Sequence, residues 1–339
     1  MTRVLTWHVH GNYLLYLSRA DVELVVPYLE SRRHPYGGRV GTFPWPDNLV
    51  EVPVGDLRHE RFDVVLHQSL ETWRYDRQVV LTEAQREVPQ IVLEHDPPRR
   101  SPFDSRHPVV GENVLLVHVT HFNELAWDNG DTPTRVIEHG VEVPPEARYT
   151  GELERGLVVV NNLASRGRRL GLDVFLRARE HVPLDLVGMG SEELGGLGEI
   201  PPDELPAFAA RYRFLFNPIR WTSLGLAVCE AMHVGLPVVG LATTEMSRAI
   251  ENGVCGYVDT DVRALVRRMR HLLADPEHAQ RLSAGARLLA RERYGIDRFA
   301  RSWTETFEEV AAGDQRVRSR TAASRPSDQR RASVSKSVR

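Results

Sequence analysis

The chain of 339 residues is long enough for about two domains, each with its own hydrophobic core. Apolar residues make up 42% of it and the formal net charge is −3, so the chain as a whole is not intrinsically disordered. No run of about 18 uncharged apolar residues occurs, and no signal peptide is expected at the amino terminus. Cys229 and Cys255 can form neither a disulfide framework nor a zinc site, so we expect a cytoplasmic protein.

The last segment, 313–339, differs in composition from the rest of the chain. From Asp314 onward it has eight basic residues, two acidic ones and almost no apolar ones. This composition predicts a disordered basic tail without a function of its own, although nucleic acid or anionic lipid could attract it. Without the tail's net +6 the body carries −9, which argues against nucleic acid as the main partner. The only lysine is Lys336, so a phosphate site in the body must use arginines or backbone amides.

Short β-branched runs alternate with helical patterns along the chain, as in parallel sheets covered by helices. In the first half, near-continuous apolar runs predict four strands, at 3–9, 63–69, 90–96 and 113–120. Ligands of open α/β sheets bind at the carboxyl ends of the strands. We therefore expect the polar residues that end these runs to gather at one edge: His8, His10, His67, His95, Asp96, Thr120 and His121.

A polar segment with proline and glycine, 143–156, is the predicted linker between two domains. Beyond it the pattern predicts further strands, at 156–163, 184–190, 214–219, 237–242 and 256–261. Helices are expected over about 168–180 and over 223–234, and three more up to about residue 312. The predicted fold is therefore α/β, with two Rossmann-like domains whose parallel sheets face a central cleft.

Two short motifs are similar to those of dinucleotide-binding and metal-binding proteins, but neither fits. The nearest glycine fingerprint, Gly188-Met-Gly190-Ser-Glu-Glu193, follows a predicted strand but lacks the third glycine of dinucleotide-binding proteins, and no P-loop sequence occurs. A nicotinamide-dependent oxidoreductase is therefore disfavoured. Asp259-Thr-Asp261 has the spacing of a metal-binding pair, but its place between a strand and a helix predicts a helix N-cap instead.

The stretch FLFNPIRWTSLGLAVCEAMHVGLPVVG, residues 214–240, is the most informative part of the sequence. A strand ends at Asn217-Pro218, and Ser223-Leu224-Gly225 opens a helix whose first backbone amides would bind an anion such as a diphosphate. Glu230, two turns into that helix, could accept hydrogen bonds from a ribose. Taken alone, these residues fit a plain capped helix packed on a parallel sheet equally well.

The same region resembles the C-terminal domain of the retaining family 4 glycosyltransferases, which have the GT-B fold. The matching motifs are Gly225-Leu226, Glu230-Ala231-Met232, Gly235-Leu236-Pro237-Val238-Val239, Ile250-Glu251-Asn252-Gly253 and Gly256-Tyr257-Val258. The segments LLADPEHAQRLSAGAR and YGIDRFARSWTETF match as well, so the similarity covers about 150–312 and extends more weakly into the first half. It implies an acceptor-binding domain at 1–145, a nucleotide-sugar-binding domain at 146–295 and a helix, 296–312, that crosses back onto the first domain.

The resemblance also implies roles for single residues. Of the family's two glutamates, the one that holds the ribose matches Glu230, whereas the one that touches the donor sugar falls on Thr222, which leaves the sugar preference open. The family's diphosphate-binding lysine falls on Leu170. We therefore expect the diphosphate to be held by Arg166 and Arg169 with the helix start, residues Ser223, Leu224, Gly225 and Leu226, and the base to lie near Ile200.

On the side of the first domain, His95 corresponds to a histidine near the reacting sugar in the family. His8, His10, Gly11 and Asn12 follow the first strand, where the loop of this fold approaches donor and acceptor.

We therefore expect a retaining glycosyltransferase that moves a sugar from a nucleoside-diphosphate sugar to a hydroxyl of a small, soluble acceptor. His95, Arg166 and Arg169 would be its catalytic residues, and neither a cofactor nor a divalent metal would be required. A catalytically silent sugar-nucleotide binder and a sugar-nucleotide epimerase of the same fold remain alternatives. The sequence identifies neither the donor's base and sugar nor the acceptor, and it leaves a homodimer open.

Overall fold

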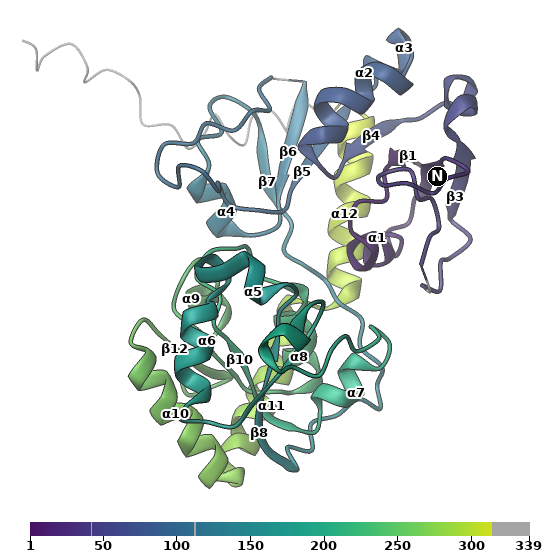
Figure 1. The fold of residues 1–339 in the computed structure, drawn as a ribbon. Coiled ribbons are helices and arrows are strands. Elements are labelled where there is room, and N and C mark those ends of the chain that lie inside the picture. Colours follow the sequence, from purple (N-terminus) through teal and green to yellow (C-terminus); the bar gives the residue numbers. More distant parts are fainter. Residues whose placement is uncertain (42, 112, 314–339) are drawn as a thin grey trace, which may run out of the picture.

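The computed structural model describes residues 1–41, 43–111 and 113–313, which form two domains, each built around one parallel β-sheet (Figure 1). Apart from Gly313, the predicted basic tail lies outside these residues. No helix in the described ranges is long and apolar enough to cross a membrane.

The first sheet has seven strands in the order β3-β2-β1-β4-β5-β6-β7, and all neighbours are parallel. Its strands are β1 (Arg3–Thr6), β2 (Glu23–Tyr28), β3 (Leu49–Pro53), β4 (Val64–His67), β5 (Gln90–Glu94), β6 (Val114–His118) and β7 (Thr134–Val136). The helices of this part are α1 (Gly11–Leu17), α2 (Arg77–Val80), α3 (Glu83–Arg86) and α4 (His121–Ala126), with a 3₁₀ helix over Val54–His59 and a π turn over Thr72–Asp76.

The sequence pattern predicts no strand at the positions of β2, β3 and β7, and this prediction is wrong. β2 includes Pro27, which lacks a backbone donor and makes a short run look unlike a strand. In the structure Pro27 pairs in register with Val52 of β3.

The second sheet has five parallel strands in the order β12-β11-β10-β8-β9. Its strands are β8 (Leu153–Val159), β9 (Leu184–Val187), β10 (Tyr212–Asn217), β11 (Val238–Leu241) and β12 (Gly256–Asp259). The helices are α5 (Leu163–Arg166), α6 (Leu172–Arg179), α7 (Leu205–Ala209), α8 (Leu226–Val234), α9 (Met246–Ala249), α10 (Val262–Ala274), α11 (Pro276–Arg293) and α12 (Ile296–Ala311), with 3₁₀ helices over Gly167–Leu170 and Ser191–Leu194.

Three predicted boundaries in this half are wrong for local reasons. The linker ends earlier than residue 156, because β8 begins at Leu153 and its exposed, polar start pairs with β10. The helix predicted from Ser223 begins at Leu226, because Gly225 is extended (φ −72°, ψ 145°). The helix predicted over 168–180 is broken at Gly171, whose φ is +83° and where a Cβ would lie 1.9 Å from the carbonyl oxygen of Pro218.

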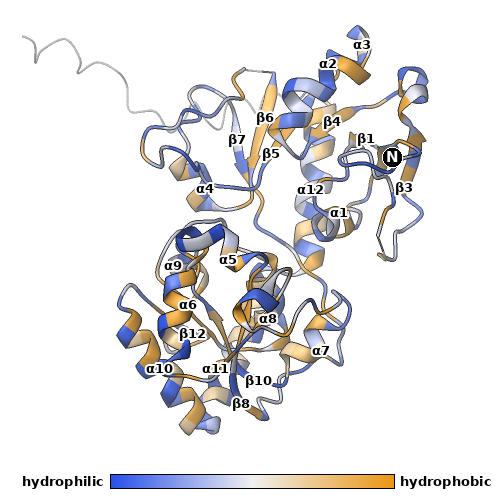
Figure 2. Ribbon diagram, viewed as in Figure 1, coloured by the Kyte–Doolittle hydropathy of each residue, from blue (hydrophilic) through white to orange (hydrophobic). Residues whose placement is uncertain are grey.

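The last helix, α12, ties the two domains together. Its buried residues Phe299, Trp303, Thr306 and Phe307 follow the helical period and form one buried, mostly aromatic stripe. This stripe packs against the first domain, where the Trp303 indole donates a hydrogen bond to the Tyr13 hydroxyl at 3.2 Å. Figure 1 shows α12 running beside α1 and the strands of the first sheet, and Figure 2 shows hydrophobic residues concentrated in strands such as β5 and β6.

Candidate functional site

A cavity of about 640 Å³ lies between the two domains. Its walls come from the segments that follow β1, β5 and β7 in the first sheet and β8, β9 and β10 in the second. These are the carboxyl ends of parallel strands, where open α/β sheets bind their ligands. We call this space the inter-domain cavity.

The first turn of α8 and the residues before it form one wall of the inter-domain cavity. Ser223, Leu224, Gly225 and Leu226 all line it. The N-cap residue, Gly225, has no side chain, and within the described ranges no hydrogen bond uses the backbone N–H of Leu226 or Ala227. These N–H groups and the positive end of the helix dipole favour an anion in front of the helix.

Arginine side chains add positive charge to the same cavity. Arg166, at the end of α5, and Arg99, after β5, both line it. Burial lowers the pKa of Arg166, and the neighbouring guanidinium groups of Arg169 and Arg99 lower it further. Arg169 is thus close to Arg166, although it does not line the cavity itself. Arg168 is exposed and pairs instead with Asp173 at 2.7 Å.

Glu230 lies on α8 and is one of the acidic residues that line the inter-domain cavity, with Glu199 and Asp96. Its carboxylate accepts a hydrogen bond from the Tyr16 hydroxyl of the first domain at 3.0 Å. Burial raises the pKa of Glu230, and the hydrogen bond from Tyr16 opposes that shift. Burial and the nearby Glu230 also raise the pKa of Tyr16, so its hydroxyl stays protonated and donates.

Three histidines meet on the opposite wall, around Tyr13. The ring of His95 lies edge-to-face with that of His10 at 4.6 Å and with that of Tyr13 at 4.8 Å, and His139 lies 5.8 Å from Tyr13. His95 Nε2 and His139 Nδ1 are buried without a hydrogen-bond partner among the described residues.

The environment keeps these three imidazoles uncharged. Burial lowers the pKa of each of them, well below its usual range for His95 and to about 4 for His139. They are therefore neutral at pH 7 and can exchange hydrogen bonds with hydroxyl groups of a ligand.

The structure brings most of the predicted site residues together. Those that line the inter-domain cavity are His10, Gly11, Asn12, His95, Arg166, Ile200, Ser223, Leu224, Gly225, Leu226 and Glu230. Three do not line it. They are His8, whose Nδ1 contacts the Gly38 carbonyl at 2.6 Å, the half-buried Thr222, and Arg169.

The polar strand ends of the first sheet do not all gather at this cavity. His67 is fully buried and its Nε2 contacts Gln90 Oε1 at 2.8 Å, so it belongs to the core. Thr120 caps α4 by accepting a hydrogen bond from the Asn123 N–H at 3.1 Å. Leu170, at the place of the family's lysine, is also buried in the core.

Four residues at the site were missed by the sequence analysis: Tyr13, Tyr16, Arg99 and His139. Tyr13 and Tyr16 are spaced like core positions of an amphipathic helix, which hides their polar contacts. His139 follows the short strand β7, which the sequence analysis omits. Arg99 comes four residues after His95, and this closeness was the available signal.

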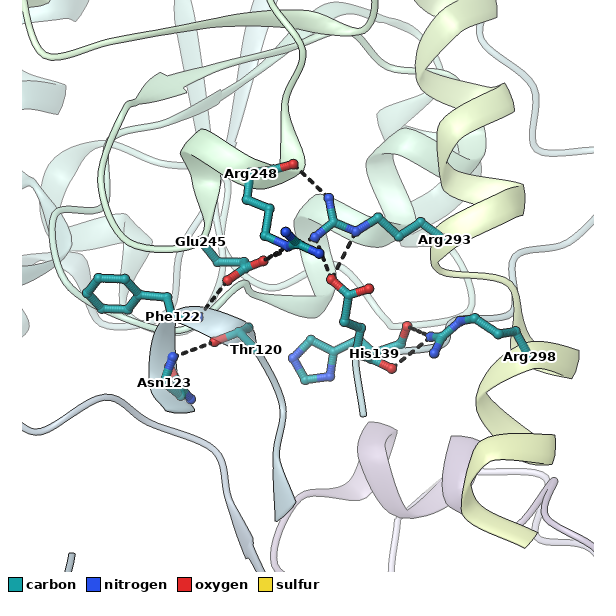
Figure 3. Close-up of polar contacts among 9 residues, drawn as sticks. Thr120, Phe122, Asn123, His139, Glu245, Arg248, Arg293 and Arg298 are labelled. Carbon is teal, nitrogen blue, oxygen red and sulfur yellow. Dashed lines mark hydrogen bonds and ion pairs between the residues drawn. The ribbon is translucent and has the colours of Figure 1, made fainter. Parts of the chain in front are cut away.

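An ionic contact also joins the two domains (Figure 3). Arg293, at the end of α11, contacts Glu138 after β7 at 2.5 Å and Glu245 before α9 at 3.1 Å. Glu245 also accepts a hydrogen bond from the N–H of Phe122 in α4 at 2.9 Å, and only 2% of this glutamate is exposed. Burial raises the pKa of Glu245, and the Phe122 N–H and Arg293 oppose that shift.

The backbone that carries His139 is held by α12. Arg298 donates hydrogen bonds to the carbonyl oxygens of Glu138 and His139, at 2.8 and 2.6 Å (Figure 3). His139 therefore has a fixed place at the junction of the domains.

The described part of the chain contains no group of three or more His, Cys, Asp or Glu that could hold a metal ion. At the predicted N-cap, the Asp261 carboxylate accepts a hydrogen bond from the Arg263 N–H at 2.8 Å, so this prediction is confirmed.

Comparisons with known proteins agree with this geometry. Residues 155–275 match the family described as "Glycosyl transferases group 1". No curated protein matches the sequence. Among solved structures, sucrose-phosphate synthase from Thermosynechococcus elongatus is 14% identical, with a TM-score of 0.68 over 92% of this chain and 100% of that chain.

Two further solved structures are similar. HepE from Anabaena, in complex with UDP and glucose, is 12% identical with a TM-score of 0.67, over 91% of this chain and all of that one. AviGT4, a glycosyltransferase involved in avilamycin A biosynthesis, is 17% identical with a TM-score of 0.61, over 92% of this chain and 99% of that one.

These likenesses show the fold over more than nine-tenths of the chain, and it is that of the GT-B glycosyltransferases. The prediction of an α/β fold with two parallel sheets is therefore confirmed. The family match over 155–275 confirms the prediction of a glycosyltransferase enzyme. Membership of family 4 stays a prediction.

Proposed function

We propose that this chain, which carries a glycosyl transferases group 1 domain within a GT-B fold, moves a sugar from a nucleoside-diphosphate sugar to a hydroxyl group of a small, soluble acceptor. One observation carries the proposal: the start of α8, Arg166 and Glu230 line the same cavity as the neutral His95, whose Nε2 has no hydrogen-bond partner among the described residues. Such a reaction needs a helix start that binds phosphate, a carboxylate that accepts hydrogen bonds from the ribose, and an imidazole that hydrogen-bonds the sugar.

In this proposal the diphosphate lies against the start of α8 and Arg166, with Arg169 behind. The Glu230 carboxylate accepts hydrogen bonds from the ribose hydroxyls, and the base lies near Ile200. Donors aimed at the leaving diphosphate stabilise the negative charge that develops as the sugar leaves, a contribution of several kcal/mol, about 3, at comparable oxyanion sites. The complex of HepE with UDP and glucose supports this class of donor.

We propose transfer with retention of configuration. The acceptor oxygen forms the new bond to the anomeric carbon on the face from which the diphosphate leaves, and its proton passes to a diphosphate oxygen. This route needs no nucleophile from the enzyme. His95 would donate a hydrogen bond to the sugar, and His10, Gly11 and Asn12 would contact donor and acceptor. Thr222 and His8 would reach the ligands only after the adjoining turns shift.

We further propose that the reaction uses no divalent metal, because arginines and helix amides already supply positive charge to the phosphate end. A cytoplasmic location is proposed as well. The two free, buried cysteines support it, since thiols stay reduced in the cytoplasm.

Release of nucleoside diphosphate from sugar nucleotides tests the proposal. The purified chain is incubated with UDP-, GDP-, ADP- and dTDP-glucose, with and without EDTA. A glycosyltransferase releases the diphosphate, slowly with water and faster with an acceptor, and EDTA changes nothing. Binding without any release would identify a silent binder instead, and conversion of the donor without release would identify an epimerase.

A further inference from the structure

A second cavity, of about 520 Å³, opens on the first domain at the carboxyl ends of β1, β4 and β5. It shares four wall residues with the inter-domain cavity: His10, His95, Asp96 and Arg99. The two spaces are therefore contiguous, and His95 lies where they meet. We call the second one the arginine cavity, after the four arginines that line it, Arg74, Arg99, Arg100 and Arg106.

The carboxylates in the arginine cavity are already engaged. Glu94 accepts a hydrogen bond from the Asp96 N–H at 2.9 Å and contacts His107 Nε2 at 3.1 Å. Asp96 pairs with Arg99 at 2.5 Å. Two negative charges thus face four positive ones, and the local excess is positive although the body of the chain is negative.

The side chains of the three other arginines are free of polar contacts with the described residues. In the part of the chain that the structure describes, no ion pair or hydrogen bond involves the side chain of Arg74, Arg100 or Arg106. All three are exposed, and they line the arginine cavity but not the inter-domain cavity. An anion bound by them would lie apart from the diphosphate, which the α8 wall attracts.

Two buried polar atoms indicate that a ligand with hydroxyl groups fits here. Gln68 is 1% exposed and lines the arginine cavity. Its amide nitrogen donates to Thr6 and to the Trp7 carbonyl, each at 3.0 Å, whereas its Oε1 has no partner among the described residues. His95 Nε2 is likewise buried and unpartnered. Such atoms cost stability unless a ligand or water satisfies them.

We infer that the acceptor occupies the arginine cavity and carries, besides its reacting hydroxyl, a phosphate or carboxylate group that Arg74, Arg100 and Arg106 bind. This inference rests on the proposed function, in which the contiguous inter-domain cavity holds the donor. The planar guanidinium fork matches both anions and binds them through two parallel hydrogen bonds. A pocket lined with one sign of charge also concentrates ligands of the opposite sign.

Calorimetric titration of the full chain tests the inference. The probes are glucose 6-phosphate, glucuronate and glucose, added after the inter-domain cavity has been saturated with the nucleoside diphosphate that binds best. We expect the two anionic sugars to bind at least about tenfold more tightly than glucose, because each gains charge-assisted hydrogen bonds. Measurable binding of both glucose and glucose 6-phosphate with equal affinity would overturn the inference.

A pair of double variants assigns the effect to the cavity. Arg74→Gln with Arg106→Gln should lower the affinity for glucose 6-phosphate by about tenfold or more and leave the nucleotide affinity unchanged. Arg58→Gln with Arg301→Gln removes the same charge from exposed positions outside both cavities and should change neither affinity. Undiminished glucose 6-phosphate binding in the first double variant would also overturn the inference.

Phosphatidylglycerol vesicles distinguish a lipid phosphate from a soluble one. One outcome is that the wild type co-sediments with the vesicles but does not bind glucose 6-phosphate, while the first double variant does not co-sediment. That result would support the anion site and assign its phosphate to a lipid headgroup. If the protein neither binds glucose 6-phosphate nor co-sediments with the vesicles, the anion site is contradicted. Arginine-dependent binding of glucose 6-phosphate without any nucleotide binding would support the site while refuting the proposed donor function.

Discussion

The hydroxyl of Tyr16 donates a hydrogen bond to Glu230 across the two domains, at 3.0 Å and over 214 positions of sequence. Tyr16 lies on α1 of the first domain and Glu230 lies on α8 of the second, within the wall of the inter-domain cavity. The carboxylate proposed to bind a ribose is therefore oriented by the domain that does not carry it. If Glu230 binds the ribose as proposed, the association of the domains and the binding of the nucleotide depend on the same carboxylate.

The first prediction concerns this hydrogen bond. Tyr16→Phe keeps the ring and removes the donor, so Glu230 is left buried without that partner. We expect the free energy of unfolding to fall by about 1–3 kcal/mol, as for other buried groups that lose a hydrogen bond. Tyr28→Phe is the matched control, because no hydrogen bond among the described residues uses that hydroxyl. Equal midpoints of the two variants in urea would contradict a stabilising contribution of this hydrogen bond.

The second prediction separates two arginines that are close in sequence. Arg166 lines the inter-domain cavity, whereas Arg168 points to Asp173. Arg166→Gln should weaken nucleoside-diphosphate binding by about tenfold or more, because a charge-assisted contact to the diphosphate is lost, and should leave binding of the unphosphorylated nucleoside unchanged. Arg168→Gln should bind both as the wild type does. Calorimetry measures the affinity of each variant for the nucleoside diphosphate and for the nucleoside. An equal loss of diphosphate affinity in the two variants would refute the assignment.

The third prediction concerns the ionic contact between the domains. Arg293→Met leaves Glu138 without its cation. Among the described residues it leaves Glu245, with 2% of its surface exposed, in an ion pair with Arg248 alone, at 3.3 Å. Removing one partner of a buried pair leaves a charge uncompensated, so we expect a loss of about 3 kcal/mol in the free energy of unfolding. Arg19→Gln breaks the exposed pair with Glu142 instead and should cost less than about 1 kcal/mol. Denaturant titration of the two variants tests this difference.

The fourth prediction concerns pH. Burial lowers the pKa of His67 to about 4, whereas an unfolded chain has a histidine pKa of about 6.5. Above pH 6.5 both states are neutral and this contribution to stability is complete. As the pH falls toward 4, only the unfolded state gains a proton, so stability is lost by about 1.4 kcal/mol for each pH unit.

His67→Gln should therefore lose less stability between pH 7.5 and pH 5 than the wild type does. Exposed His181, replaced in the same way, should respond to acid as the wild type does. An unchanged acid response in His67→Gln would show that protonation of this buried imidazole does not limit stability.

In the second domain, the part of the candidate site that is formed by residues close together in the sequence could be predicted. The strand β10, the turn before α8 and Glu230 lie within 19 positions, from Tyr212 to Glu230, and each has a local signal. The start of α8 was placed three residues early, because the propensity of Ser223-Leu224 for a helix start does not reveal the extended backbone of Gly225.

The contacts between the domains could not be predicted from local sequence patterns. Tyr16 and His139 acquire their roles from residues that are far away in the sequence, and their own spacing fits a buried core equally well. Arg74 and Arg106 are typical of exposed positions, and only the fold brings them to one cavity with Gln68. Such side chains have no local pattern because packing of distant segments determines their surroundings.

The central claim is that the inter-domain cavity binds a nucleoside diphosphate. The most direct measurement is the thermal stability of the full chain with UDP, GDP, ADP, dTDP, CDP or NAD, each with and without EDTA. A ligand at about 100 times its Kd adds roughly 2.7 kcal/mol of stability. We predict that at least one diphosphate raises the midpoint, that EDTA does not change this shift, and that Glu230→Ala diminishes it. No shift with any diphosphate, or a shift with NAD alone, would contradict the account.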